Sequence, residues 1–288
     1  MRAIYKRELK SYFYSMTGYV FIAFVTMFIG IYFMATNMLG GYPYFSYTLG
    51  AILIILLIAI PVLTMKSMSE EHHSRTDQLL LTSPVSLWSV VMGKYLSMVT
   101  VFAIPMAISC LCPLIIKASG TAYLAEDYGA ILTFFLLGCV YIAIGLFISS
   151  LTESQLIAAA GTFGVLLLLT LWPYLISFIP TSARDSLIGL LLLLTLLAFV
   201  LYRLTGCAPL SLGLEAAGAA ALAAVYFYKK SLLDRALTHL LGKIVLADVF
   251  NTVVNDHILD LGGLLYYVSA AFIMLFLTVQ TIEKRRWS

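Results

Sequence analysis

The chain has few charged residues. Asp, Glu, Lys and Arg make up 11% of its 288 residues and hydrophobic residues make up 62%, whereas a soluble domain carries about 25% charged residues. A chain this apolar has too few polar side chains to cover a globule in water, so its folded surface needs hydrocarbon around it. The composition therefore excludes a soluble domain and predicts a protein that crosses a membrane several times.

The chain also lacks the residue patterns of common catalytic and metal sites. Its four cysteines lie in or beside apolar runs, without zinc-site spacing, and we interpret them as packing residues. Neither a phosphate-binding loop nor an HExxH sequence is present. His72 and His73 are adjacent, so their imidazoles diverge on a helix and do not easily share a metal. We expect no catalytic residue, no metal site, no cofactor bound by this chain and no nucleic-acid partner.

What the sequence does contain is a series of apolar runs, each near the length of about 20 residues that a membrane-spanning helix needs. We predict an all-α polytopic membrane protein, with one transmembrane domain over residues 1–288 and about eight spans. The predicted spans are Gly18–Thr36, Leu49–Met65, Trp88–Ile116, Gly129–Ser149, Gln155–Phe178, Leu187–Tyr202, Leu210–Phe227 and Leu259–Ile282. Because proline removes a backbone donor, bends are expected at four positions. These are Pro61, Pro105, Pro113 and Pro173.

The basic residues predict the orientation of the spans. Eight spans place both termini on one side of the membrane. The N-terminal helix, the Lys66–Lys94 stretch, Arg203 and the C-terminal tail hold 11 of the 17 Lys and Arg residues, and basic residues favour the cytoplasmic side. We therefore expect both termini in the cytoplasm, although Lys229 and Lys230 then fall on the outer side.

Residues 187–227 contain the weakest pair of predicted spans, because Glu215 lies in the second one. A carboxylate at the centre of a span costs about 2.5–3.5 kcal/mol on insertion scales, and each Leu or Phe returns only about 0.3–0.6 kcal/mol. We expect the two spans to insert together, with Glu215 near the cytoplasmic end and within reach of Arg203. A structural ion pair is favoured, and a functional carboxylate is the alternative.

Two further segments have the spacing of amphipathic helices. In residues 1–15, Tyr5, Leu9 and Tyr12 recur at helical spacing among basic residues, which predicts a helix in the cytoplasmic interface. In residues 229–258, apolar residues between Leu232 and Val245 follow an i, i+3/i+4 rhythm, which predicts an amphipathic helix on the outer surface. Such a helix would either cap an exit path or form a packed lid.

The main charged interruption of the first hundred residues is segment 66–87, between the second and third predicted spans. Residues 66–81 have helical spacing, and Ser83-Pro84 ends the helix because a residue before proline leaves the α region. A charged helix joined to two spans moves both when it is pushed, although a solvated loop is also compatible with the pattern. The candidate functional residues here are Met68, Glu70, Glu71, His72, Arg75, Thr76, Leu79, Leu80, Leu81 and Pro84.

The stretch MKSMSEEHHSRTDQLLLTSPVSLWSVVMGKYL resembles the signature of type-2 ABC exporter permeases. In that family E-E-x-x-x-G-T-x-E-x-L-L-x-x-P-V follows the second span, and a Gly-Lys begins the third. The matching positions are Glu70, Glu71, Thr76, Leu80, Leu81, Pro84, Val85, Gly93 and Lys94. Arg75 and Gln78 depart from the family's Gly and Glu. YKRELKSYFYSMTGYVF and HILDLGGLLYYVSAAFIMLFLTVQTIEKRRW resemble the two ends of the gliding-motility-type branch, relative to which 187–227 looks like an inserted span pair.

The resemblance implies the permease subunit of an ATP-driven exporter in the bacterial cytoplasmic membrane. Segment 66–87 would then be the coupling region that docks on an ABC ATPase, present in two copies, which would bind the ATP and Mg. A second permease copy or a paralogue, an accessory membrane protein and membrane lipid are the other partners, and the substrate is expected to be amphiphilic. The alternatives are an ion-coupled carrier that uses Glu215 and a membrane scaffold without a pathway; a membrane enzyme is disfavoured because polar residues are not clustered.

Overall fold

The computed structural model describes residues 1–73, 86–179, 182–205, 213, 215–220, 226, 228, 235–243 and 245–287. Within these residues every regular element is a helix and none is a strand, which confirms the all-α prediction. The helices are α1 (Arg2–Tyr14), α2 (Thr17–Phe33) with the π-helical η1 (Met34–Leu39), α3 (Ser46–Thr64), α4 (Ser69–His73), α6 (Leu87–Ser109), α7 (Cys112–Ser119), α8 (Leu124–Leu151), α9 (Gln155–Ser177), α10 (Ala183–Thr205), α12 (Ala236–Gly242), α13 (Leu246–Asp256) and α14 (Leu261–Trp287).

The chain divides into two compact units. Unit 1 comprises Met1–Leu169 and Leu246–Ser288, and unit 2 comprises Thr170–Val245. The predicted span pair 187–227 lies within unit 2. In that unit α10 packs against α12, and the indole of Trp172 donates a hydrogen bond to the Leu241 carbonyl at 3.1 Å. The prediction of one transmembrane domain is not tested by this division.

Six helical segments among the described residues are long and apolar enough to cross a membrane, which confirms a multi-pass membrane protein. They are Thr17–Leu39, Ser46–Glu71, Leu87–Ser119, Leu124–Leu151, Gln155–Ser177 and Leu261–Lys284. They correspond to six of the eight predicted spans, and α12 with α13 would add a seventh if the pair formed one span. α10 covers Leu187–Tyr202, whereas much of Leu210–Phe227 lies outside the described residues. The total of eight stays a prediction.

The predicted bends take different forms. The third span is interrupted after Ser109, and α7 restarts it with Pro113 in its first turn, where a missing N–H costs nothing. Pro61 lies inside α3, which continues past it to Thr64. The segment predicted as one amphipathic helix within 229–258 contains two helices, α12 and α13, in its described part. α13 is strongly amphipathic, because Leu246, Phe250 and Val253 are buried while Asp248 is exposed.

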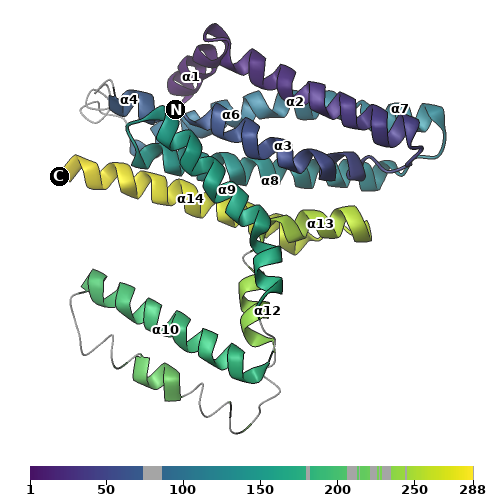
Figure 1. The fold of residues 1–288 in the computed structure, drawn as a ribbon. Coiled ribbons are helices and arrows are strands. Elements are labelled where there is room, and N and C mark those ends of the chain that lie inside the picture. The colour runs from purple at the N-terminus through teal and green to yellow at the C-terminus, as the bar shows by residue number, and fades with distance from the viewer. Residues whose placement is uncertain are drawn as a thin grey trace. The chain divides into compact units, whose positions relative to one another are not determined.

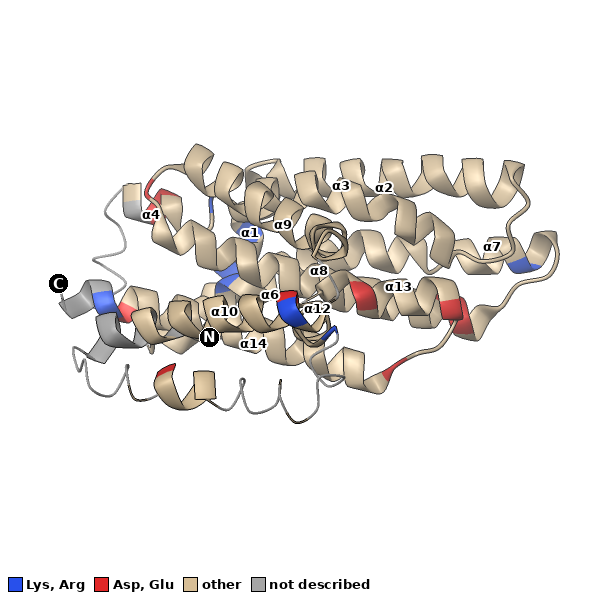
Figure 2. Ribbon diagram, turned by 60° about the horizontal axis from the view of Figure 1, so that its bottom comes forward, with Lys and Arg blue, Asp and Glu red and all other residues tan. Residues whose placement is uncertain are grey.

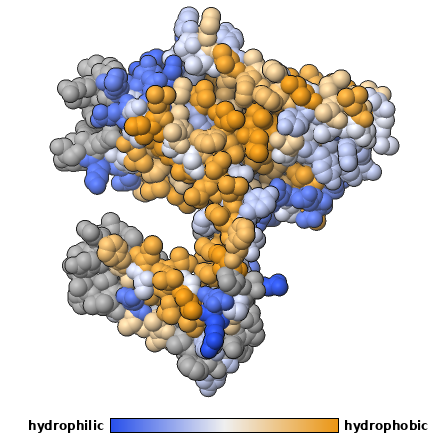
Figure 3. Space-filling model, in the orientation of Figure 1, coloured by the Kyte–Doolittle hydropathy of each residue, from blue (hydrophilic) through white to orange (hydrophobic). Residues whose placement is uncertain are grey.

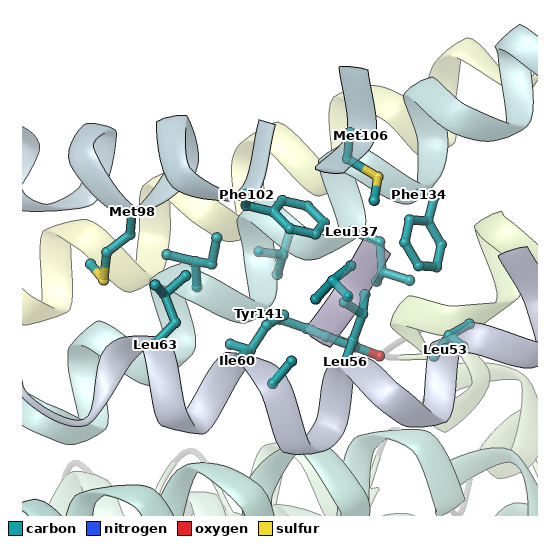
Figure 4. Close-up of a cluster of buried hydrophobic side chains, with 14 of the residues drawn as sticks. Leu53, Leu56, Ile60, Leu63, Met98, Phe102, Met106, Phe134, Leu137 and Tyr141 are labelled. Carbon is teal, nitrogen blue, oxygen red and sulfur yellow. The ribbon is translucent and has the colours of Figure 1, made fainter. Parts of the chain in front are cut away.

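Helix α8 is the centre of unit 1. It packs against α3, α6, α13 and α14, while α2 packs against α3 and α6 (Figure 1). Figure 4 shows the contact of α3, α6 and α8, where Leu56, Phe102 and Tyr141 are fully buried. Close packing of this kind holds helices together in lipid, where apolar burial alone gives no preference for protein over hydrocarbon. Gly138 permits it, since a Cβ there would lie 2.2 Å from Cε1 of Phe102.

Most charged residues of unit 1 lie toward its two ends (Figure 2), and hydrophobic residues cover much of the middle of the face seen in Figure 3. The basic end, as we call it, holds Arg7, Lys66 and Lys94, and α14 runs toward it (Figure 1). The far end holds Glu126, Asp127 and His257. This separation is typical of a bundle whose middle lies in hydrocarbon, while the cytoplasmic location of the basic end stays a prediction.

Candidate functional site

Lys94 is the centre of a polar cluster at the basic end. Its side chain is only 2% exposed, on helix α6. The ammonium donates a hydrogen bond to the Ser67 carbonyl at 2.8 Å and lies 2.8 Å from Oε1 of Glu71 and 3.4 Å from Oε2 of Glu8. A buried ammonium is costly unless it is paired and hydrogen-bonded, so these three oxygens account for its position.

Arg7 completes the cluster from helix α1. Its Nη2 lies 2.7 Å from Glu8 Oε1 and 3.4 Å from Glu71 Oε1, and the hydrogen bond to Glu8 raises the pKa of the Arg7 guanidinium. We call Arg7, Glu8, Glu71 and Lys94 the ion-pair cluster. It carries two positive and two negative charges, and it joins α1, α4 and α6.

A glycine allows α1 to approach α6 closely. A Cβ on Gly93 would lie 3.0 Å from Cγ2 of Ile4 on α1, a tight contact to which the Ile4 side chain would have to adjust. Seven residues after Gly93 on α6, Thr100 Oγ1 is hydrogen-bonded to the Tyr5 hydroxyl of α1 at 3.0 Å. Gly93 therefore permits the close contact of α1 with α6, and the neighbouring Lys94 supplies the positive charge that pairs with Glu8 of α1.

The turn between α3 and α4 is attached to the end of α8. Ser149 Oγ accepts hydrogen bonds from the backbone N–H groups of Met68 and Ser69, at 3.1 and 3.2 Å, and donates one to the Met65 carbonyl at 3.3 Å. The Ser69 hydroxyl also donates to the Met65 carbonyl. The helix predicted to start at Lys66 therefore starts at Ser69, because residues 65–68 form this turn.

Tyr12 attaches α1 to the end of α3. Its hydroxyl donates a hydrogen bond to the Leu63 carbonyl at 3.3 Å. Burial raises the pKa of Tyr12, so the hydroxyl stays a neutral donor. Together with Lys94 and Ser149, this contact links the segment between α3 and α4 to α1, α6 and α8.

A polar cavity of about 340 Å³ lies beside the ion-pair cluster. Charged and hydroxyl side chains from α1, the start of α2, the α3–α4 segment and α6 line it. They are Arg7, Glu8, Ser11, Tyr12, Ser15, Thr17, Lys66, Ser67, Glu70, Glu71 and Lys94.

The structure describes part of the predicted site, whose role stays a prediction. Glu71, Gly93 and Lys94 are brought together, Met68 is buried in the α3–α4 turn and Glu70 lines the cavity. The side chain of His72 lies outside the described part, as do Arg75, Thr76, Leu79, Leu80, Leu81 and Pro84. Glu215 lies half-buried in a helical stretch of unit 2, and the side chain of Arg203 is not among those described, so their pairing stays a prediction.

Sequence reasoning missed Arg7, Glu8, Ser67 and Ser149. Arg7 is one of the basic residues of the predicted interfacial helix and Glu8 was not singled out, because an adjacent pair of opposite charge gives no sign of a distant partner. Ser67 takes part through its backbone carbonyl, which no side-chain pattern reports. Ser149 stands at the end of a predicted span beside a second serine, and only the fold distinguishes the two.

The far end is held together by aromatic rings. Tyr44 stacks on Tyr123 with ring centroids 4.7 Å apart, and on His257 at 4.1 Å. We call these three rings the aromatic stack. His257 Nδ1 lies 3.6 Å from Glu126 Oε2, and the fully buried Asp127 accepts a hydrogen bond from the Phe45 N–H at 2.7 Å. The described residues contain no group of three or more His, Cys, Asp or Glu side chains that could hold a metal.

The fold and the charge distribution define a polytopic helical membrane protein whose connecting segments are fixed to its spans at the basic end. Residues 39–227, well over half of the chain, match the family described as ABC-2 family transporter protein. The chain therefore belongs to the ABC-2 transporter family, whose members are membrane components of ABC transporters. No curated protein and no solved structure matches the chain. The matched range includes segment 66–87 and Lys94, and it extends through residues 187–227; the gliding-motility-type branch stays a prediction.

Proposed function

We propose that this permease component couples to a separate ABC ATPase through segment 66–87, and that the ion-pair cluster transmits the resulting movement to the membrane spans. The observation that carries the proposal is the contact of Lys94 with three segments. Its ammonium reaches Glu71 of α4, Glu8 of α1 and the Ser67 carbonyl, and Lys94 itself belongs to a span.

The contacts give a path for mechanical force. A displacement of α4 acts on α6 through Glu71 and Lys94, on α1 through Arg7, and on α8 through Ser149. Short hydrogen bonds to charged groups are about twice as strong as those between neutral groups, so they resist being pulled apart. A push on one short helix is thereby shared among three others.

The charge distribution supports an energy source outside this chain. In the described spans of unit 1 the Asp, Glu, Lys and Arg residues lie toward the helix ends, with Lys94 in the second turn of α6 and Asp127 in the first turn of α8. An ion-driven carrier normally needs such a group near the middle of the membrane. We therefore assign ATP and Mg to a partner, and we further propose two ATPase copies, a second permease copy and an amphiphilic substrate.

The test begins with isolation of the complex. The tagged full chain is purified from its native membrane, and the co-isolated chains are identified. The proposal expects a phosphate-loop ATPase among them. After reconstitution in vesicles, Glu71→Ala is expected to retain the ATPase but to lower its permease-dependent ATP turnover about tenfold, the effect of about 1.4 kcal/mol. Lys117→Met, an exposed residue of α7, serves as the control.

Two further substitutions of Glu71 separate its charge from its size: Glu71→Asp keeps a carboxylate for Lys94 and Arg7, whereas Glu71→Gln keeps the size without the charge. Turnover that is retained in Glu71→Asp and lost in Glu71→Gln, with both variants folded by thermal unfolding, supports the proposal. If no ATPase is isolated, the scaffold alternative gains. If transport stops with a protonophore while ATP remains, the carrier alternative gains, and either result would contradict coupling through segment 66–87.

A further inference from the structure

The polar cavity at the basic end has the composition of a headgroup site. Three basic residues, Arg7, Lys66 and Lys94, and three acidic residues, Glu8, Glu70 and Glu71, line it. Their formal charges cancel. A site without net charge gives no general attraction to an anion or to a cation, and it suits a ligand that carries one group of each sign.

Part of the lining is available for hydrogen bonds to a phosphate. Lys66 is half-buried and forms no ion pair among the described residues, in contrast to Lys94. The Ser67 hydroxyl, on a residue that is 6% exposed, is buried and lies in the lining beside Tyr12. Ser11, Ser15 and Thr17 add three more hydroxyls to the same cavity; those of Ser15 and Thr17 are hydrogen-bonded to each other at 2.6 Å, so this pair has one O–H left to donate. An ammonium and several hydroxyls are the donors that a phosphodiester accepts from.

The surroundings of the cavity are those of a lipid rather than of a free ion. The cavity lies where α1 ends and α2, a membrane span, begins at Thr17. Apolar side chains at this corner are exposed, with 72% of Met16 and 62% of Val20 accessible. Tyr14 and Tyr19 are also exposed there. A molecule whose polar group enters the cavity would find an apolar surface for its chains along the start of α2.

We propose that this cavity binds the headgroup of a glycerophospholipid that combines a phosphodiester with a primary ammonium. Lys66 and the hydroxyls of Ser15, Thr17 and Ser67 hold the phosphodiester. The carboxylate side of the cavity, which includes Glu70, accepts from the primary ammonium. The headgroup thereby occupies the space between α1 and the α3–α4 segment, next to the ion-pair cluster. The site does not depend on the proposed ATPase, because every residue in it belongs to this chain.

The test compares lipids that differ only in their headgroups. The full chain, in the complex in which it is isolated, is exchanged into vesicles containing equal amounts of phosphatidylethanolamine, phosphatidylcholine and phosphatidylglycerol with the same acyl chains. It is then extracted, and the retained lipid is measured by native mass spectrometry. Phosphatidylethanolamine is expected to be retained about tenfold over phosphatidylcholine, which has the same charges but no N–H donor.

Variants assign the retained lipid to this cavity. Lys66→Ala is expected to abolish the preference for phosphatidylethanolamine, while Lys66→Arg keeps it. Lys10→Ala, an exposed residue of the same α1 helix that does not line the cavity, keeps it as well. Thermal unfolding of each variant shows that the fold is retained, and Lys66→Gln, which removes the charge but keeps most of the length, replaces Lys66→Ala if that variant fails to fold; retention of the preference without the Lys66 charge would contradict this site.

Three outcomes would overturn the proposal. Equal retention of the three lipids shows that the cavity does not select a headgroup. Preference for phosphatidylglycerol shows that it selects an anion. Displacement of the lipid by millimolar inorganic phosphate assigns the cavity to free phosphate instead of a lipid.

Discussion

The two ends of unit 1 are fixed by different interactions. At the basic end, four charged side chains join α1, α4 and α6 around a lysine that is 2% exposed. At the far end, three stacked rings and one carboxylate join the loops that precede α3, α8 and α14. Ion pairs between helices keep much of their attraction over several ångströms in a poorly solvated site, whereas ring stacking is lost with a small separation.

Under the proposed function, this difference suits the two ends to different tasks. A joint of ion pairs can stretch and reform while α4 moves, so it suits the end that receives force. Stacked rings are either in contact or separated, so they suit the end that keeps a transport path closed or lets it open. Four substitutions test this comparison, beginning with the one that should have the largest effect.

Lys94→Met should have the largest effect. It leaves the carboxylates of Glu8 and Glu71 without their shared cation, and breaking a buried pair typically costs about 3–5 kcal/mol. The side chains of these two residues are 14% and 19% exposed, so solvent relieves the loss only partly. Thermal unfolding in detergent measures the cost. Lys117→Met should change it by less than about 0.5 kcal/mol, and equal effects from both would contradict the role of the cluster.

Ser149→Ala removes the link between α8 and the α3–α4 turn. The N–H groups of Met68 and Ser69 lose their acceptor, which should cost about 1–3 kcal/mol. The neighbouring Ser150→Ala is the matched control, because among the described residues that hydroxyl bonds to the Phe147 carbonyl of its own helix and not to the turn. Thermal unfolding compares the two. A larger loss for Ser150→Ala would show that α8 is not fixed to the turn through Ser149.

Asp127→Ala tests the carboxylate at the far end. The Phe45 N–H at the start of α3 loses its acceptor, with an expected cost of about 1–2 kcal/mol. Asp127→Asn keeps an acceptor oxygen and should recover most of that stability, which distinguishes a hydrogen-bond role from a charge role. Asp248→Asn, on the exposed face of α13, is the control in the same unfolding measurement. Similar losses for Asn and Ala would indicate that charge matters at this end too.

Tyr44→Leu should have the smallest effect. It removes both ring contacts of the aromatic stack, and an aromatic pair contributes about 0.5–1.5 kcal/mol beyond its buried area. Tyr44 is only half-buried and Leu keeps apolar contact at this position, so the net loss is expected to stay below about 1 kcal/mol. Tyr44→Phe keeps both rings in place and should unfold at nearly the temperature of the unchanged protein. If Phe is as damaging as Leu, the hydroxyl of Tyr44 and not its ring holds the far end together.

Much of the fold could be predicted because long apolar runs have few alternatives in a membrane. Six of the predicted spans coincide with helices that are long and apolar enough to cross a membrane. Their ends are less predictable, since a helix end depends on its partners: α4 starts at Ser69 because Ser149, which is 80 residues away in sequence, binds the turn before it. The predicted amphipathic rhythm ends at Val245, and helix α13, which begins at Leu246, was not predicted.

Candidate site residues could be named where a local sequence pattern marks them, and they were missed where only the fold brings them to the site. Gly93 and Lys94 were identified through resemblance, and Glu71 through its place in a charged segment, but nothing in the sequence pairs residues 71 and 94. Arg7 and Glu8 depend on α1 packing against Gly93. The aromatic stack draws one ring from each of three loops, and a single histidine such as His257 gives no sign of its partners before the loops meet.

The burial of Lys94 determines how the ion-pair cluster responds to the salt concentration around the protein. Dissolved ions weaken attractions between exposed charges at physiological strength, where the Debye length is about 8 Å, but they screen buried neighbours much less. Lys94 is inaccessible, and its carboxylate partners are within 3.4 Å. A rise in internal potassium during osmotic stress should therefore weaken the ion pairs of Lys94 little, while it weakens ion pairs at the protein surface more.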